Sequence, residues 1–299
     1  GIVSSARNHS INNGILTSGG SELVVSVMSN QLTVNSAIQG AGMSLTKGGA
    51  WLLILTNSNT FDGRTYINNG TLRISQESNL GIVPGAPVAD QLQINGGSLQ
   101  IGSTMNLSAN RGVLIGAAGG RIEVGTSNSS VFNVTIPTIN AEGVLELAVR
   151  ADQGLGTTSS LTIGSAGVSS IFAGGLKTDF YQGTMLVLGN NTVGPVYVEA
   201  GSLTLQGNNQ FTGDIRMVAG KLTLNGTNSL SGEVNVSEGE LSLLSAGALG
   251  MDGFSLNLGN GKLTLNDTAQ TIRATTSTTK AEIVNGGSAA AVLTFDVDI

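Results

Sequence analysis

One short pattern recurs along this chain: a glycine followed by residues that alternate between polar and apolar. Two clear copies are Gly220-Lys-Leu-Thr-Leu and Gly239-Glu-Leu-Ser-Leu. The glycines of the eight copies are Gly70, Gly97, Gly120, Gly143, Gly201, Gly220, Gly239 and Gly261. They lie 27, 23 and 23 residues apart in the first run and 19, 19 and 22 apart in the second. Self-similarity at about 20 residues is typical of solenoids.

Each repeat predicts two short strands joined at a glycine corner. Ile215 and Met217 alternate with polar residues before Gly220, and Leu222 and Leu224 alternate after it. Period-two alternation gives a strand one buried and one solvated face. A single unit cannot bury its apolar face alone, whereas stacked units share one core. The sequence therefore predicts an all-β chain, a right-handed parallel β-helix in one elongated domain. An antiparallel sandwich is the alternative, but it does not require glycines at fixed offsets.

The best-preserved unit, residues 38–74, adds a more specific motif. It contains Leu45-Thr-Lys-Gly, an apolar strand, Asn59-Thr-Phe-Asp-Gly and Asn69-Gly-Thr-Leu. This order resembles the autotransporter-associated β-strand repeat, and the resemblance extends over most of residues 38–265. It implies a β-helix passenger domain of a bacterial surface or secreted protein. The repeat itself is scaffold, so it does not imply a particular activity.

The repeats divide the chain into five predicted segments. These are N-terminal strands (1–37), β-helix coils (38–150), an irregular coil or loop (151–180), regular coils (181–265) and a C-terminal coil (266–299).

The composition argues against several functions. Charged residues make up 11% of the chain, the formal net charge is −6, and there is one histidine and no cysteine. Zinc and iron–sulfur sites need ligands that this chain lacks. Nucleic-acid binding favours a basic surface, and no apolar run approaches the length of a membrane helix. We predict no cofactor, no metal site, no nucleic-acid partner and no membrane-embedded segment.

Three features are compatible with catalysis, and each has a simpler interpretation. His9 is predicted to be a solvated side chain near the N-terminus, without the partners that a catalytic histidine needs. Ser44 and Lys47 have the spacing of some acyl-transfer enzymes, but that motif requires a helix. Glu233 and Glu240 could serve a glycan-cleaving enzyme, but Glu240 is expected to pair with Lys221 on the neighbouring coil. We therefore predict a non-enzymatic protein without catalytic residues.

Residues four positions before an aligned glycine are predicted to face outward. They are Tyr66, Tyr197, Arg216 and Asn235. We predict that these four residues form a lateral contact strip. The last three come from consecutive coils, so they should stack into a ladder on one face. Tyrosine, arginine and asparagine suit contacts with a glycan or protein ligand on a host surface. Phe61 and Phe211 are instead predicted to pack at corners.

The ends of a solenoid are the second candidate site. A terminal coil without a cap exposes an unpaired strand edge that can add another chain. The predicted assembly edges are Leu23, Val25, Val27, Leu32, Val34, Val292, Leu293 and Phe295. Two functions follow. The first is a scaffold or adhesin segment of an extracellular or outer-surface bacterial passenger. The alternative is a subunit of an extracellular filament that assembles with itself by end-to-end β-stacking or strand exchange.

Overall fold

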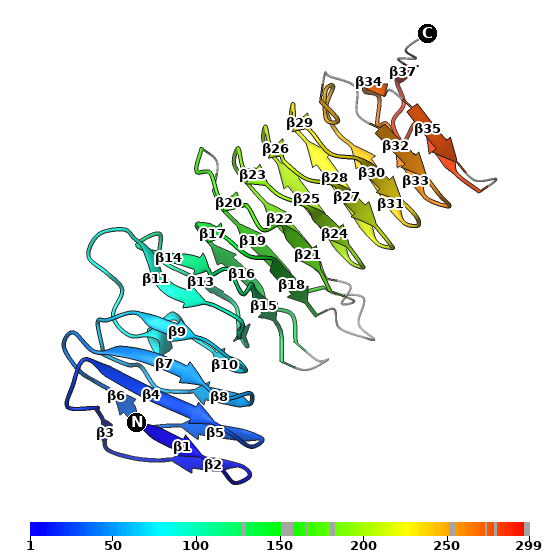
Figure 1. Ribbon diagram of the computed structural model, residues 1–299. Coiled ribbons are helices and arrows are strands. Elements are labelled where there is room, and N and C mark those ends of the chain that lie inside the picture. The colour runs from blue at the N-terminus through cyan, green and yellow to red at the C-terminus, as the bar shows by residue number, and fades with distance from the viewer. Residues whose placement is uncertain are drawn as a thin grey trace.

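The computed structural model describes residues 1–126, 130–150, 158–165, 167–179, 183–250, 255–272, 274–277 and 280–295. In these residues the chain is all-β apart from a short 3-10 helix, η1 (Glu77–Leu80). The strands stack turn upon turn into an elongated parallel solenoid, with the two termini at opposite ends (Figure 1). The predicted parallel β-helix is confirmed.

Three long sheets form the faces of the solenoid. The first sheet contains, in spatial order, β1 (Ile2–Ser4), β4 (Glu22–Val27), β7 (Ser44–Gly48), β9 (Thr65–Ile67), β11 (Val88–Ile94), β14 (Arg111–Ile115), β17 (Ile139–Ala141), β20 (Ile171–Phe172), β23 (Thr192–Val193), β26 (Gln210–Phe211) and β29 (Ser229–Leu230). The second sheet contains β2 (His9–Ile11), β5 (Gln31–Val34), β8 (Leu52–Leu55), β10 (Thr71–Ile74), β12 (Ser98–Ile101), β15 (Gly120–Val124), β18 (Leu145–Val149), β21 (Leu176–Thr178), β24 (Val196–Val198), β27 (Ile215–Met217), β30 (Val234–Val236), β32 (Ser255–Leu258) and β35 (Ala274–Ser277).

The third sheet begins further along the chain. It contains β13 (Met105–Asn106), β16 (Asn133–Ile136), β19 (Ser160–Ile163), β22 (Thr184–Val187), β25 (Ser202–Gln206), β28 (Lys221–Asn225), β31 (Glu240–Leu243), β33 (Lys262–Thr264) and β36 (Glu282–Val284). Two small pairs join β3 (Ile15–Leu16) to β6 (Ala37–Ile38), and β34 (Ala269–Ile272) to β37 (Val292–Phe295). Strands β19, β20 and β21 lie within residues 151–180, so this segment, expected to be irregular, contributes one strand to each sheet.

The core consists of apolar columns that run along the solenoid axis. On the second sheet, one buried column is Leu32, Leu53, Leu72, Leu99, Ile122 and Leu147. On the third sheet, another is Leu161, Met185, Leu203, Leu222, Leu241 and Leu263. Each turn thus buries its inward side chains against the turns before and after it. This shared burial is what makes a 20-residue unit stable.

The repeat changes face along the solenoid. The strands that follow Gly70, Gly97, Gly120 and Gly143 are β10, β12, β15 and β18 of the second sheet. The strands that follow Gly201, Gly220, Gly239 and Gly261 are β25, β28, β31 and β33 of the third sheet. The sequence alignment treated all eight copies as equivalent. In the structure the first four lie on the second sheet and the last four on the third, so the two runs are not equivalent. All three faces demand the same alternation, so the motif does not specify which face it occupies.

Two kinds of corner require glycine, for different physical reasons. Gly220 has a φ of 75° and a Cβ there would lie 2.6 Å from the Gly201 carbonyl oxygen. Gly232, seven residues before Gly239, has no positive φ, but its Cβ would lie 2.5 Å from atoms of Gly213 on the preceding turn. The glycines seven residues upstream therefore permit close backbone stacking rather than a left-handed conformation.

A buried asparagine ladder holds the corner before the first sheet in the C-terminal half. The side-chain Nδ2 of Asn191 donates to Asn209 Oδ1 at 2.9 Å, and Nδ2 of Asn209 donates to Asn228 Oδ1 at 3.1 Å. The backbone amides of Asn191 and Asn209 donate to the same two oxygens. The ladder ends at the carbonyl oxygen of Ala248, which accepts from Asn228 Nδ2 at 2.7 Å. Each asparagine thus satisfies backbone groups that a sharp corner would leave unpaired.

Arg111 fixes the only 3-10 helix of the described residues to the rest of the solenoid. The Arg111 side chain is fully buried, and its guanidinium donates to the carbonyl oxygens of Leu80, Gly81 and Ile82 at 3.0 to 3.2 Å. Its Nε lies 3.4 Å from Glu77 Oε1. Burial lowers the pKa of the guanidinium, and Glu77 opposes that shift. Phe61 and Phe211 are also fully buried, which confirms their predicted packing role.

Candidate functional site

The predicted lateral strip forms on the outer face of the second sheet. Tyr197 pairs in register with Arg216, and Arg216 pairs with Asn235, on the adjacent strands β24, β27 and β30. Their inward neighbours, such as Val196 and Val198, are buried, so the three side chains face outward. The predicted stacking of these three residues is confirmed. Their role in binding stays a prediction.

Tyr66 does not belong to this strip. It lies on β9 of the first sheet, where it pairs with Thr46 and Gln93. The prediction was wrong for Tyr66 because the repeat occupies different faces in the two halves of the solenoid. The position four residues before the glycine is therefore on the first sheet at Gly70 and on the second sheet at Gly201.

The strip continues along the second sheet in both directions. Its in-register members, which we call the outer ladder, are Ser98, Arg121, Glu146, Lys177, Tyr197, Arg216, Asn235 and Asn257. Sequence reasoning missed Arg121 and Glu146 because the alignment on glycine places Arg121 opposite Val144. In the structure Gly120 pairs with Leu145, so the register slips by two residues and brings Arg121 opposite Glu146. The one sequence signal for this pairing was the opposite charge of Arg121 and Glu146 in consecutive repeats.

A dense network of ion pairs surrounds Arg121. Its guanidinium contacts Glu146 at 2.6 Å, Asp179 at 2.5 Å and Glu123 at 3.6 Å. Burial lowers the pKa of Arg121, but the three carboxylates outweigh burial and leave the pKa above its ordinary value. Arg150 contacts Glu123 at 2.6 Å. The Arg121 side chain is therefore held in place by three carboxylates, which reduces the entropy that it would lose on binding a ligand.

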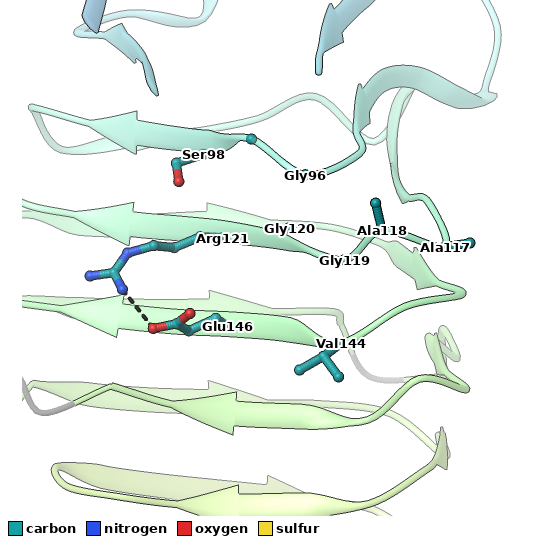
Figure 2. A pocket seen from close by; sticks show the side chains of 10 residues that line it. Gly96, Ser98, Ala117, Ala118, Gly119, Gly120, Arg121, Val144 and Glu146 are labelled. Atoms are coloured by element: carbon teal, nitrogen blue, oxygen red, sulfur yellow. Dashed lines mark hydrogen bonds and ion pairs between the residues drawn. The ribbon is translucent and has the colours of Figure 1, made fainter. Parts of the chain in front are cut away.

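A shallow hollow opens beside this ion pair. It has a volume of about 410 Å³ and is lined by Gly96, Gly97, Ser98, Ala117, Ala118, Gly119, Gly120, Arg121, Val144 and Glu146. Figure 2 shows small residues from successive corners around it, with the Arg121–Glu146 pair at one side. The hollow lies where the first sheet turns into the second, at the starts of β12, β15 and β18.

The residues that suggested catalysis are not assembled into an active site. Lys47 points into the core, and its Nζ donates to the carbonyl oxygens of Gly48, Gly49 and Asn69 at 2.7 to 2.9 Å. Ser44 lies three residues away on the same strand, so it faces the opposite side. His9 is exposed and contacts the Ser4 hydroxyl at 3.2 Å. Within the described residues no carboxylate bonds to the His9 ring.

The two glutamates considered for glycan cleavage lie at different faces. Glu233 is exposed just before β30 of the second sheet, whereas Glu240 begins β31 of the third. Lys221 Nζ lies 3.1 Å from Glu240 Oε1, which confirms the expected ion pair. Burial raises the pKa of Glu240, but hydrogen bonds from Thr264 and Lys221 outweigh it and lower the pKa overall. A general acid needs the opposite shift.

The structure corrects the position of the predicted N-terminal assembly edge. Leu23, Val25 and Val27 are buried on β4, which pairs with β1 on one side and β7 on the other. Leu32 and Val34 are buried on β5, between β2 and β8. These five residues are core residues rather than edge residues, because residues 1–21 already form a turn of the solenoid.

The C-terminal candidates lie on β37. This strand pairs with β34 through Val292, Leu293 and Phe295, and Val292 is 55% exposed. The Phe295 side chain lies outside the part of the chain that the structure describes. End-to-end filament assembly stays a prediction.

Lys47 gives the solenoid a specific pH dependence. Burial lowers the pKa of Lys47 from 10.5 to about 8. Between pH 8 and 10.5 the unfolded chain therefore holds more protons than the folded chain, so the free energy of unfolding should rise with pH in this window, by at most about 3 kcal/mol. Urea unfolding at several pH values checks this. In Lys47→Met the rise should disappear, and parallel pH curves for the two proteins would contradict the assignment.

Comparison with known proteins supports the class that the fold defines. The model of the passenger-associated transport repeat matches residues 45–74, 198–216 and 219–243. The first match covers β7 to β10, and the other two together cover β25 to β31. The chain is thus similar to the β-helix passengers of autotransporters, and the resemblance inferred from the sequence is confirmed.

One relative is the adhesin BmaC autotransporter of Brucella suis biovar 1 (strain 1330). It is 36% identical over 87 residues, which is 29% of this chain and 2% of that protein. The match therefore spans only a small part of the relative. No solved structure matched the chain. Among the described residues, no helix is long and apolar enough to span a membrane, and no three acidic or histidine side chains cluster as metal ligands do.

Proposed function

We propose that this chain is a non-enzymatic segment of an autotransporter passenger, exposed at the bacterial surface or secreted, and that it acts as an adhesin scaffold. The similarity to a named adhesin and to the passenger repeat supports the class. The observation that carries the contact role is the in-register stack of Tyr197, Arg216 and Asn235 on the outer face of the second sheet.

The physical basis of the proposal is the rigidity of this face. Each member of the outer ladder sits on a strand that is hydrogen-bonded on both sides and anchored by buried neighbours. Tyrosine and arginine contribute strongly to binding where they are held in place. The Arg216 side chain is 58% exposed and lies 3.1 Å from Asp214, so it remains available to a ligand.

The test is attachment of the purified chain to cultured epithelial cells. The variant Tyr197→Ala/Arg216→Ala should lower the apparent affinity by at least about tenfold, equivalent to about 1.4 kcal/mol. Tyr66→Ala is the matched control, because it removes the same side chain from the first sheet, and it should bind as the wild type does. Equal losses in the two variants, or no loss in either, would refute the contact role. Release of reducing sugar ends by the wild type would refute the non-enzymatic role.

A further inference from the structure

We propose that the hollow beside Arg121 and Glu146 binds an uncharged glycan, of about the size of a disaccharide. This inference rests on the proposed adhesin function and names the chemistry of its ligand. The volume of the hollow, about 410 Å³, falls in the usual range of small-ligand sites, roughly 300–1,000 Å³.

The shape of the hollow is fixed by backbone packing. A Cβ on Gly97 would lie 2.6 Å from Ile67 Cγ2, and a Cβ on Gly120 would lie 2.7 Å from Ile94 Cγ2. These corners therefore cannot carry larger side chains. Gly119 has a φ of 75°, which excludes most other residues as well. The hollow exists before any ligand arrives, so binding does not require a rearrangement.

The charges beside the hollow favour a neutral ligand. The guanidinium of Arg121 already contacts Glu146, Asp179 and Glu123. An anionic ligand would compete with these carboxylates, and a cationic ligand would compete with the arginine. A sugar hydroxyl both donates and accepts hydrogen bonds. It can therefore bond to the guanidinium and the carboxylate at once without separating the pair.

The remaining wall suits the apolar face of a sugar ring. Val144 is 40% exposed and Ala117 and Ala118 are exposed at the same corner. Figure 2 shows Ala118 and Val144 on the opposite side of the hollow from the Arg121–Glu146 pair. One wall thus presents methyl groups and the other presents paired hydrogen-bonding groups. The Ser98 hydroxyl adds a further polar contact at the side of the outer ladder.

The experiment titrates the whole chain with named sugars by saturation-transfer NMR and calorimetry. The probes are lactose, cellobiose and N,N′-diacetylchitobiose as neutral disaccharides, 3′-sialyllactose as an anion and glucosamine as a cation. We expect binding of at least one neutral disaccharide. Ala118→Trp should fill the hollow and weaken that binding by at least about tenfold. Ala173→Trp is the matched control, because it places the same side chain at the same corner two turns further on, and should change the affinity less than about twofold.

Glu146→Gln separates a neutral from an anionic ligand. It removes one negative charge but keeps a hydrogen-bonding group, so neutral-sugar binding should persist and sialyllactose binding should not increase. The proposal is overturned if no neutral sugar binds, if Ala118→Trp and Ala173→Trp behave alike, or if Glu146→Gln converts the site to strong sialyllactose binding. If no sugar binds but cell attachment still depends on Tyr197 and Arg216, the hollow is not a glycan site and the proposed adhesin function stands.

Discussion

Asn209→Ala should lower the free energy of unfolding by about 3 kcal/mol, because the substitution leaves several buried polar groups without partners. Asn209 Oδ1 accepts from the backbone amide and from Nδ2 of Asn191, and its Nδ2 donates to Gly207 and Asn228. Alanine supplies none of these bonds. Each turn of a solenoid is stabilised mainly by the turns next to it, so the substitution should also destabilise the corners of the preceding and following turns. Urea unfolding monitored by circular dichroism measures the loss.

The adjacent residue provides the control. Asn208 also bonds along the solenoid, since its Oδ1 accepts from the backbone amide of Thr227 at 2.8 Å, but it is exposed. Water can replace that partner, so Asn208→Ala should cost less than about 1 kcal/mol. Similar losses in the two variants would show that burial does not set the strength of the asparagine ladder.

Arg111→Met is expected to destabilise the chain by about 3 kcal/mol or more and to expose residues near η1 to proteolysis. Methionine keeps the apolar stem but leaves the carbonyl oxygens of Leu80, Gly81 and Ile82 without their donor. It also removes the ion pair with Glu77, whose Oε1 still accepts from the backbone amide of Ser108. Breaking a buried pair from one side is costly because the groups left behind stay desolvated.

Arg64→Met tests whether burial is the cause. Arg64 makes an ion pair with Asp90 at 3.0 Å, but the two side chains are 44% and 34% exposed. Exposed pairs contribute little, so this substitution should change the free energy of unfolding by less than about 1 kcal/mol. Limited proteolysis and urea unfolding of both variants make the comparison. An intact η1 region in Arg111→Met would contradict the role of Arg111.

The interior and the exterior of this solenoid obey different constraints. Inward positions repeat leucine, isoleucine and valine from turn to turn, because each must fill the same cross-section. Outward positions on the second sheet change from charged residues near Arg121 to Tyr197, Arg216 and Asn235 further along. A scaffold of this kind can alter its contact chemistry along its length without disturbing its core. This separation is consistent with the proposed adhesin function.

The sequence by itself determined the class of fold, the burial of Phe61 and Phe211, and the stack of Tyr197, Arg216 and Asn235. These features depend on period-two alternation and on regular 19-residue spacing, which are local properties of the chain. The pairing of Lys221 with Glu240 followed from the same spacing.

Only the tertiary structure decided where one half of the solenoid lies relative to the other. Because the corners differ in length, the repeat lies on the second sheet in the first run and on the third sheet in the second run. For the same reason Arg121 lies in register with Glu146. This change of sheet places Tyr66 on a different face from Tyr197, Arg216 and Asn235. Leu23 and Val25 are buried because β1 of the preceding turn pairs with their strand. The buried bonds of Lys47 and Arg111 also depend on neighbouring turns. Strand alternation is the same on every face, so the face and register of a strand are set by how consecutive turns stack, which no single repeat encodes.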